Sequence, residues 1–319
     1  MLKLFNLTTC DYDMARFDGA DDLRRFTREL GLDGIEVLPV GANSLGAIPS
    51  ELVPGVHLSY FNSWLDAYLG DVDAVKREYG STGEAERQLG GDPAGLSERL
   101  RAQLDWCASI GAQYVVYHVS NVTLDETATY RFEHTDEQVV RAALEVINRA
   151  LNGRYNFWFL VENLWWPGFT FTRPEITRAL LDGIDYPRKG IMLDTGHLMH
   201  TCLDIDTPQQ GIAHIHRCLD AHQELCRYIK GVHLHSGATG EYVRAMLREP
   251  PRPEGSYFDK LCALYEHILR IDPHQPLTCP GTRELIARIA PEFLTYEFIT
   301  LDRAQHAEFI RAQNQALFG

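Results

Sequence analysis

The sequence predicts an α/β protein that folds as a single (β/α)8 barrel. Short apolar runs alternate with helical periodicity eight times along the 319 residues, and a helix follows the last run. Several of the runs are continuously apolar, as expected for parallel strands that are covered on both faces. A doubly wound open sheet is the competing fold, but eight strand–helix units with a terminal helix favour a closed barrel.

The first half of the chain contains four of these units. Leu23, Phe26 and Leu30 recur at helical spacing, and Gly31 stops that helix. The strands and helices predicted here are, in order, strand Leu2–Thr8, helix Asp21–Leu30, strand Gly34–Leu38, strand Pro54–Tyr60, helix Leu96–Ile110 and strand Gln113–His118.

The second half repeats the alternation with clearer helix starts. Thr135 and Gln138 form a capping box, and Thr207-Pro208 places an N-cap before a proline at the first helical position. The elements predicted here are helix 135–151, strand Phe157–Glu162, helix Pro174–Leu181, strand Gly190–Asp194, helix 207–228, strand Lys230–His235, a helix near Phe258–Leu269, strand Phe293–Phe298 and helix Asp302–Leu317.

Two segments interrupt the alternation. Residues 61–96, after strand three, show no settled period, and residues 238–283, after strand seven, are rich in proline. We interpret both as insertions into one domain that spans residues 1–319. They are expected to shape the pocket and any contact within a homo-oligomer.

Composition narrows the possible functions. Lys and Arg number 30 and Asp and Glu number 44, which gives a formal charge of −14. This charge argues against nucleic acid and anionic membranes as partners and favours a small-molecule substrate. The seven cysteines form no C-x-x-C pair, residues 1–7 are too short for a signal segment, and no run is long enough to span a membrane. We therefore expect a cytoplasmic protein.

Metal-binding side chains stand at the ends of six consecutive predicted strands. In a (β/α)8 barrel these ends meet on one face, where active sites lie. Imidazole and carboxylate groups together suit Mn²⁺, Zn²⁺, Co²⁺ or Fe²⁺. We predict a site for one ion, or for two, built from His57, His118, Glu162, Asp194, His233, His235 and Glu297. His233 and His235 share one face of their strand, so either could be the ligand.

The order of these motifs resembles the xylose isomerase-like TIM barrel superfamily, which includes endonuclease IV and sugar epimerases. The matching segments are Val56–Tyr60, Tyr117-His118, Leu160–Asn163, Leu193–His197, Gly231–Gly237 and Tyr296-Glu297. The resemblance implies one ion held by Glu162, Asp194, His233 or His235, and Glu297. It also implies that His57 and His118 hold a second ion with Glu162, as in the endonuclease branch.

That branch holds a third ion through an Asp-x-His motif after strand seven. Residues 237–241 contain no such motif, so the resemblance implies no third ion here. His197 is then expected to contact substrate. Asp272-Pro273-His274, far along the second insertion, is interpreted as a turn or, alternatively, as a loop that closes the pocket.

The leading functional prediction is a metal-dependent isomerase or epimerase that acts on a sugar-like hydroxycarbonyl compound. Glu162 and Glu297 would transfer protons on opposite faces of the substrate. Trp64 and Trp165 would stack on the sugar. The alternatives are a two-metal hydrolase or phosphodiesterase of the endonuclease IV type, a lyase or dehydratase on the same scaffold, and a non-catalytic barrel.

Overall fold

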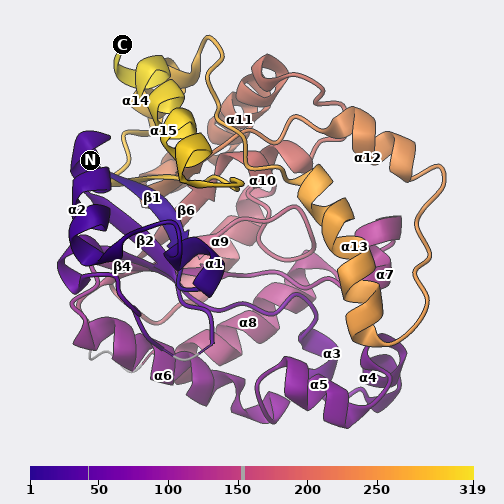
Figure 1. Cartoon of the computed structure of the whole chain (residues 1–319). Coiled ribbons are helices and arrows are strands. Elements are labelled where there is room, and N and C mark those ends of the chain that lie inside the picture. Colours follow the sequence, from indigo (N-terminus) through magenta and orange to yellow (C-terminus); the bar gives the residue numbers. More distant parts are fainter. Residues whose placement is uncertain (42, 152–154) are drawn as a thin grey trace.

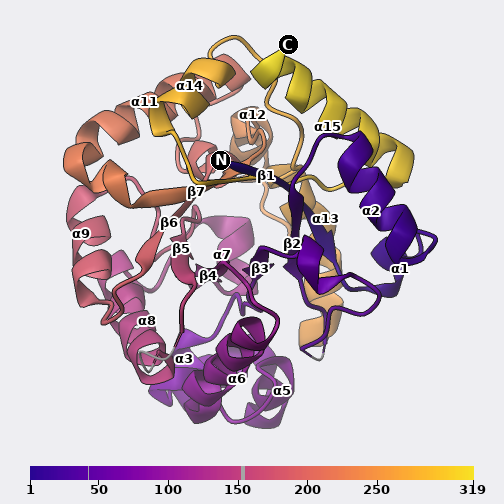
Figure 2. The same cartoon turned by 90° about the vertical axis from the view of Figure 1, so that its left-hand side faces the viewer.

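The computed structural model describes residues 1–319 except residues 42 and 152–154. Its eight strands pair in chain order as one closed parallel barrel, which confirms the predicted fold class. Figure 2 shows the helices as a ring around these strands. The strands are β1 Leu2–Thr8, β2 Gly34–Leu38, β3 Gly55–His57, β4 Tyr114–His118, β5 Trp158–Glu162, β6 Lys189–Asp194, β7 Ile229–Leu234 and β8 Phe293–Tyr296.

Helices occupy every connection between the strands except the one between β2 and β3, where a single 3₁₀ turn, η1 Ser50–Leu52, is found among the described residues. The α-helices are α1 Asp11–Met14, α2 Gly19–Glu29, α3 Leu65–Leu69, α4 Val72–Tyr79, α5 Thr82–Gln88, α6 Leu96–Ser109, α7 Leu124–Thr129, α8 Asp136–Ala150, α9 Pro174–Gly183, α10 Thr195–His200, α11 Pro208–His222, α12 Gly240–Met246, α13 Tyr257–Ile271, α14 Thr282–Ile289 and α15 Arg303–Phe318. The other 3₁₀ helices are η2 Pro93–Gly95 and η3 Gln223–Tyr228. In the described residues, no helix combines the length and the apolar character that crossing a membrane requires.

Two predicted strands end more than one residue earlier than their apolar pattern suggests. β3 stops at His57 and β8 at Tyr296, so the chain beyond each is loop. Apolar residues continue past the last residue of each strand because the loops at the barrel mouth are buried as well. Leu58 and Phe298, for example, are 1% and 3% exposed.

The segment 61–96, which was predicted without periodic structure, contains α3, α4, α5 and η2. Each helix is too short for a clear hydrophobic period, but its ends carry caps. Asp71 and Ser81 accept hydrogen bonds from backbone N–H groups at the starts of α4 and α5. Gly70 and Gly80, with φ of 77° and 81°, end α3 and α4 in the left-handed conformation. Capping residues therefore define these helices better than periodicity does.

The barrel interior has an apolar floor beneath a polar mouth. Leu4, Tyr114, Val116, Leu160, Met192 and Phe293 pack together inside the strands. Because side chains alternate along a strand, the residue two positions after each interior residue points inward one layer higher. His118, Glu162 and Asp194 stand two positions after Val116, Leu160 and Met192. The alternation that builds the floor thus also aims the metal-competent groups into the mouth.

Candidate metal centre

The first cluster joins three strand ends. His57 Nε2 and His118 Nε2 lie 3.1 Å apart, and each lies 3.2 Å from Glu162 Oε2. Two imidazole nitrogens at this distance from one carboxylate oxygen form a nearly equilateral triangle. All three atoms could bind one ion.

The second cluster shares Glu162 with the first. Glu162 Oε1 lies 3.3 Å from His233 Nδ1, which in turn lies 3.1 Å from Glu297 Oε2 and 3.8 Å from Asp194 Oδ2. The four residues form a second group that could hold an ion. The two oxygens of Glu162 therefore face different clusters.

A third cluster lies beside the second and was not expected. Asp272 Oδ2 lies 3.2 Å from His197 Nε2 and 2.7 Å from His274 Nε2, and His235 completes the group. The prediction that the chain lacks an Asp-x-His motif is wrong, because Asp272-Pro273-His274 is that motif. It follows α13 instead of following β7 directly, so a search close to the strand misses it. His197, predicted as a substrate contact only, belongs to this group as well.

Backbone carbonyls set the orientation of three of the histidines. The Nδ1 atoms of His57, His197 and His274 lie 3.0–3.1 Å from the carbonyl oxygens of Leu58, Asn163 and Glu297, respectively. A carbonyl only accepts, so each Nδ1 carries a proton, and Nε2 is the ring atom that faces the cluster and could bind a metal ion. Outer hydrogen bonds of this type are typical of metal-binding histidines.

Two further residues support the clusters and were missed at the sequence level. Glu36 on β2 is buried, and its Oε1 lies 2.8 Å from His233 Nε2, while Tyr114 and Thr295 donate to its other oxygen. Asn163 exchanges two hydrogen bonds with the backbone of Asp194 and so extends the pairing of β5 and β6. Glu36 could have been found from the sequence, since it interrupts an apolar strand.

The carboxylates remain ionised because the histidines surround them. Burial would raise the pKa of Glu162, but His233 and His118 hold it well below its usual value. His233 likewise acts against burial to lower the pKa of Glu297, and His274 and His197 do the same for Asp272. Burial would lower the pKa of His233, but the surrounding carboxylates raise it well above its usual value.

This donor set fits divalent cations. Glu162 Oε1, His233 Nδ1, His235 Nδ1 and Glu297 Oε2 are buried and make no hydrogen bond of good geometry among the described residues. Ligand atoms that share an ion at about 2.0–2.1 Å are themselves about 3.0–3.4 Å apart, which matches the first cluster. Mixed imidazole and carboxylate ligands suit Zn²⁺, Mn²⁺, Fe²⁺ and Co²⁺.

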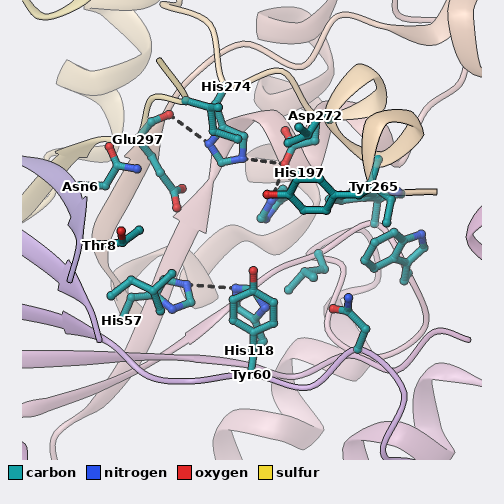
Figure 3. Close-up of a pocket in the computed structure, with 18 of the residues that line it drawn as sticks. Asn6, Thr8, His57, Tyr60, His118, His197, Tyr265, Asp272, His274 and Glu297 are labelled. Carbon is teal, nitrogen blue, oxygen red and sulfur yellow. Dashed lines mark hydrogen bonds and ion pairs between the residues drawn. The ribbon is translucent and has the colours of Figure 1, made fainter. Parts of the chain in front are cut away.

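A cavity of about 300 Å³ opens over the clusters. Figure 3 shows His57, His118 and Tyr60 on one side of it and Glu297, His274 and Asp272 on the other. Its remaining wall is largely aromatic and apolar and includes Trp165, Trp166, Leu261, Tyr265 and Ile268. No lysine or arginine among the described residues lines it.

Trp165 lines this cavity, but Trp64, the other tryptophan predicted to contact substrate, does not. The indole nitrogen of Trp64 donates to the Ser120 carbonyl at 2.8 Å, and its ring packs on Tyr68. Trp64 faces a small separate cavity of about 30 Å³. The residue follows β3 in the chain, but the turn before α3 directs its side chain away from the mouth.

Solved structures share this fold at low identity. Endonuclease IV from Thermus thermophilus is 18% identical over 99% of this chain and 98% of its own, with a TM-score of 0.51. The AsfvAP:AG crystal structure is 11% identical over 98% and 97%, with a TM-score of 0.53. A 3-keto-D-glucoside 4-epimerase from E. coli is 12% identical over 99% of both chains, with a TM-score of 0.49. At such identities the two likenesses with TM-scores above 0.5 show the fold alone.

Sequence comparison at the family level gives the assignment. No curated protein sequence matches this chain. The model of the xylose isomerase-like TIM barrel family, however, matches residues 25–259, which is most of the chain. The closed barrel and the matched residues together show that the chain belongs to the xylose isomerase-like TIM barrel family.

Proposed function

We propose that this protein is a hydrolase of a small phosphoester and that it uses two or three divalent metal ions. The observation that carries the proposal is the Glu162 carboxylate, whose two oxygens face two different clusters. A shared carboxylate is suited to hold ions about 3.5–4 Å apart, as in two-metal phosphatases and nucleases.

The first and second clusters would each hold one ion. Glu162 would bridge the first and second ions, with His57 and His118 completing the first site and Asp194, His233 and Glu297 the second. When bound, the ions would polarise the phosphoryl group, lower the pKa of a water molecule and stabilise the attacking and leaving oxygens. The negative charge of Glu36, 2.8 Å from His233 Nε2, would favour a proton on that nitrogen and leave Nδ1 for the ion.

The cavity supports a small substrate. Its volume of about 300 Å³ is at the low end for small-molecule sites, and α13 contributes Leu261, Tyr265 and Ile268 to its wall. Since no cationic side chain among the described residues lines it, the metal ions would have to neutralise the phosphate. The aromatic wall would contact the organic part of the substrate. Duplex DNA is disfavoured by this enclosure and by the charge of −14.

A sugar isomerase or epimerase is the second candidate. It is favoured by the absence of cationic side chains from the described pocket wall, which suits a neutral substrate. In that case Glu162 and Glu297 would transfer the protons. The contacts of Glu162 count against this function, since both of its oxygens are within 3.3 Å of histidine nitrogens.

Metal counting and solvent isotopes distinguish the two candidates. Metal-depleted protein would be loaded with Zn²⁺, Mn²⁺ or Co²⁺, its ions counted, and its activity measured on bis-p-nitrophenyl phosphate, nucleotides, sugar phosphates and free sugars. Solvent ¹⁸O in released phosphate would support the hydrolase. Deuterium from D₂O in an uncleaved sugar, or one tightly bound ion per chain, would overturn it.

A further inference from the structure

His200 is a buried histidine that contacts the third cluster from its outer side. Its side chain is 2% exposed, and its Nε2 lies 3.0 Å from Asp272 Oδ1 in hydrogen-bond geometry. The other oxygen of this carboxylate, Oδ2, lies 3.2 Å from His197 Nε2 and 2.7 Å from His274 Nε2. His235 Nδ1 is farther from Oδ1, at 3.7 Å, and makes no hydrogen bond among the described residues. The two oxygens of Asp272 therefore have different partners.

The contact also defines the proton on the His200 ring. A carboxylate oxygen accepts hydrogen bonds, so His200 Nε2 carries a proton and donates it to Asp272 Oδ1. With its proton in this bond, Nε2 has no lone pair for an ion. Oδ1 is engaged by this bond, and Oδ2 is the oxygen that faces His197 and His274.

The surrounding structure fixes the position of the His200 ring. A Cβ atom on Gly237 would lie 2.5 Å from His200 Cε1 and 2.6 Å from its Nε2, so any side chain at position 237 would displace the imidazole. Trp165 packs against the ring with centroids 4.9 Å apart and planes at 65°. A donor that is held in this way can fix the direction of its acceptor.

The helix that carries His200 is itself tied to the second cluster. His200 lies three residues after His197 on α10, so both rings leave the same face of the helix. Asp194 precedes the first residue of α10, and its Oδ1 accepts from the His197 backbone N–H at 2.6 Å. His200 thus connects Asp272 to a helix whose start is defined by a strand end.

Asp272 needs such a connection because it lies on a loop. It follows α13, so strand register does not define the direction of its carboxylate. Its N–H donates to the Ile268 carbonyl at 2.9 Å, and Thr239 Oγ1 donates to the Ile271 carbonyl at 2.6 Å. These bonds hold the backbone and leave the side chain free to rotate. Among the described residues outside the third cluster, only His200 donates to the carboxylate.

We infer that His200 is a positioning residue of the metal centre, which holds Asp272 so that Oδ2 faces the third ion. The inference rests on the proposed metal-dependent function and takes His197, Asp272 and His274 as ligands of that ion. Carboxylates that bind metal ions are hydrogen-bonded by outer residues, and loss of such a residue typically weakens metal binding about 10- to 100-fold. Without His200, the buried Oδ1 would lose its donor and the carboxylate its fixed direction.

Three substitutions separate the hydrogen bond from packing. H200Q places an amide near the position of Nε2, so it can still donate to Asp272. H200L and H200F fill the space but cannot donate. The matched controls are H222Q and H222L, because His222 is buried on α11 and bonds to Thr177 and Cys218 outside the clusters. Thermal melts would establish which variants fold, and either H200L or H200F is sufficient for the comparison.

The readout is the number and affinity of Co²⁺ ions bound by metal-depleted protein, measured by titration and elemental analysis. We expect three ions in the wild type and in the His222 variants. In H200L and H200F the third ion should bind about 10- to 100-fold more weakly, while the first two keep their affinity. H200Q should restore most of the affinity for the third ion.

Each failure has a different meaning. An unchanged third ion in H200L and H200F, or an equal loss of all three ions, would overturn the role of His200 and leave the proposed hydrolase intact. Weaker binding of the third ion by H200Q than by H200L and H200F would also overturn it, since the ring would then act by packing. A wild type that binds two ions would overturn the inference alone, and one that binds a single ion would overturn both proposals.

Discussion

The three clusters differ in how the chain supplies their ligands. Apart from Glu297, which follows β8 by one residue, the ligands of the first two clusters lie at the ends of strands that are neighbours in the barrel. The third draws Asp272 and His274 from a loop between α13 and α14 (Figure 1). Strand register alone brings the residues of the first two clusters together. The third cluster depends on where the long segment between β7 and β8 returns to the barrel mouth. The positions of candidate ligands on strands can thus be predicted by counting, and those of candidate ligands on loops cannot.

The largest effect is expected from E162Q, which tests the first and second clusters, whose residues lie at strand ends. The substitution removes the charge shared by two clusters, so the first and second ions should both weaken by more than about 100-fold, the upper range for loss of an outer-shell partner. Hydrolysis of bis-p-nitrophenyl phosphate should fall at least in proportion. Elemental analysis after dialysis is the measurement.

The control is E292Q, since Glu292 pairs with Lys230 on the surface. Loss of only one ion in E162Q would show that Glu162 does not bridge.

D272N tests the third cluster and should have a smaller effect than E162Q. Asn keeps the shape but loses the charge that faces His197 and His274, so one ion of three should be lost while two remain. Activity should fall by about 10- to 100-fold, because this ion acts through the others. Metal titration is the measurement, and loss of all ions together would contradict the separation of the clusters.

E36Q tests the support that Glu36 gives to His233 of the second cluster. Tyr114 and Thr295 should hold the introduced amide in place, but the negative partner of His233 is gone. The second ion should weaken by about tenfold while the number of ions at saturating metal stays the same. A Y114F variant should give a smaller change in the same direction, and unchanged affinity in E36Q would exclude this supporting role.

H306F tests a buried histidine that packs among aromatic rings away from the clusters, so the substitution leaves the site unchanged. Burial among Phe5, Phe26 and Phe298 lowers the pKa of His306 to about 4. At pH values between about 4 and about 6.5, His306 binds a proton in the unfolded chain but not in the folded one. The free energy of unfolding is therefore unaffected by His306 above a pH of about 6.5 and declines as the pH falls below it.

The wild type should lose about 2–3 kcal/mol more than H306F in unfolding free energy between pH values of about 7 and 4.5. Urea unfolding of metal-depleted proteins at both pH values is the measurement. Parallel losses in the two proteins would show that His306 is protonated in the fold. The site histidines have the opposite tendency where carboxylates surround them, as the raised pKa of His233 indicates.

Local pattern was sufficient for the fold and for the positions of the metal-competent groups on the strands. Apolar runs define the strands, and the two-residue period places His118, Glu162 and Asp194 on the inner face above Val116, Leu160 and Met192. The parallel order of the strands then brings these groups to one end. These features depend on neighbours in sequence, which is why they could be predicted.

Only the tertiary structure decided the rest. The third cluster forms only because the chain after α13 returns to the barrel mouth. The His235 ring fits only because Gly196 has no side chain where β7 approaches α10. The direction of the Trp64 side chain depends on the backbone conformation before α3. Each is a contact between segments that no local period connects. The sequence by itself determined which groups could bind metal, and packing determined how many meet and in which sets.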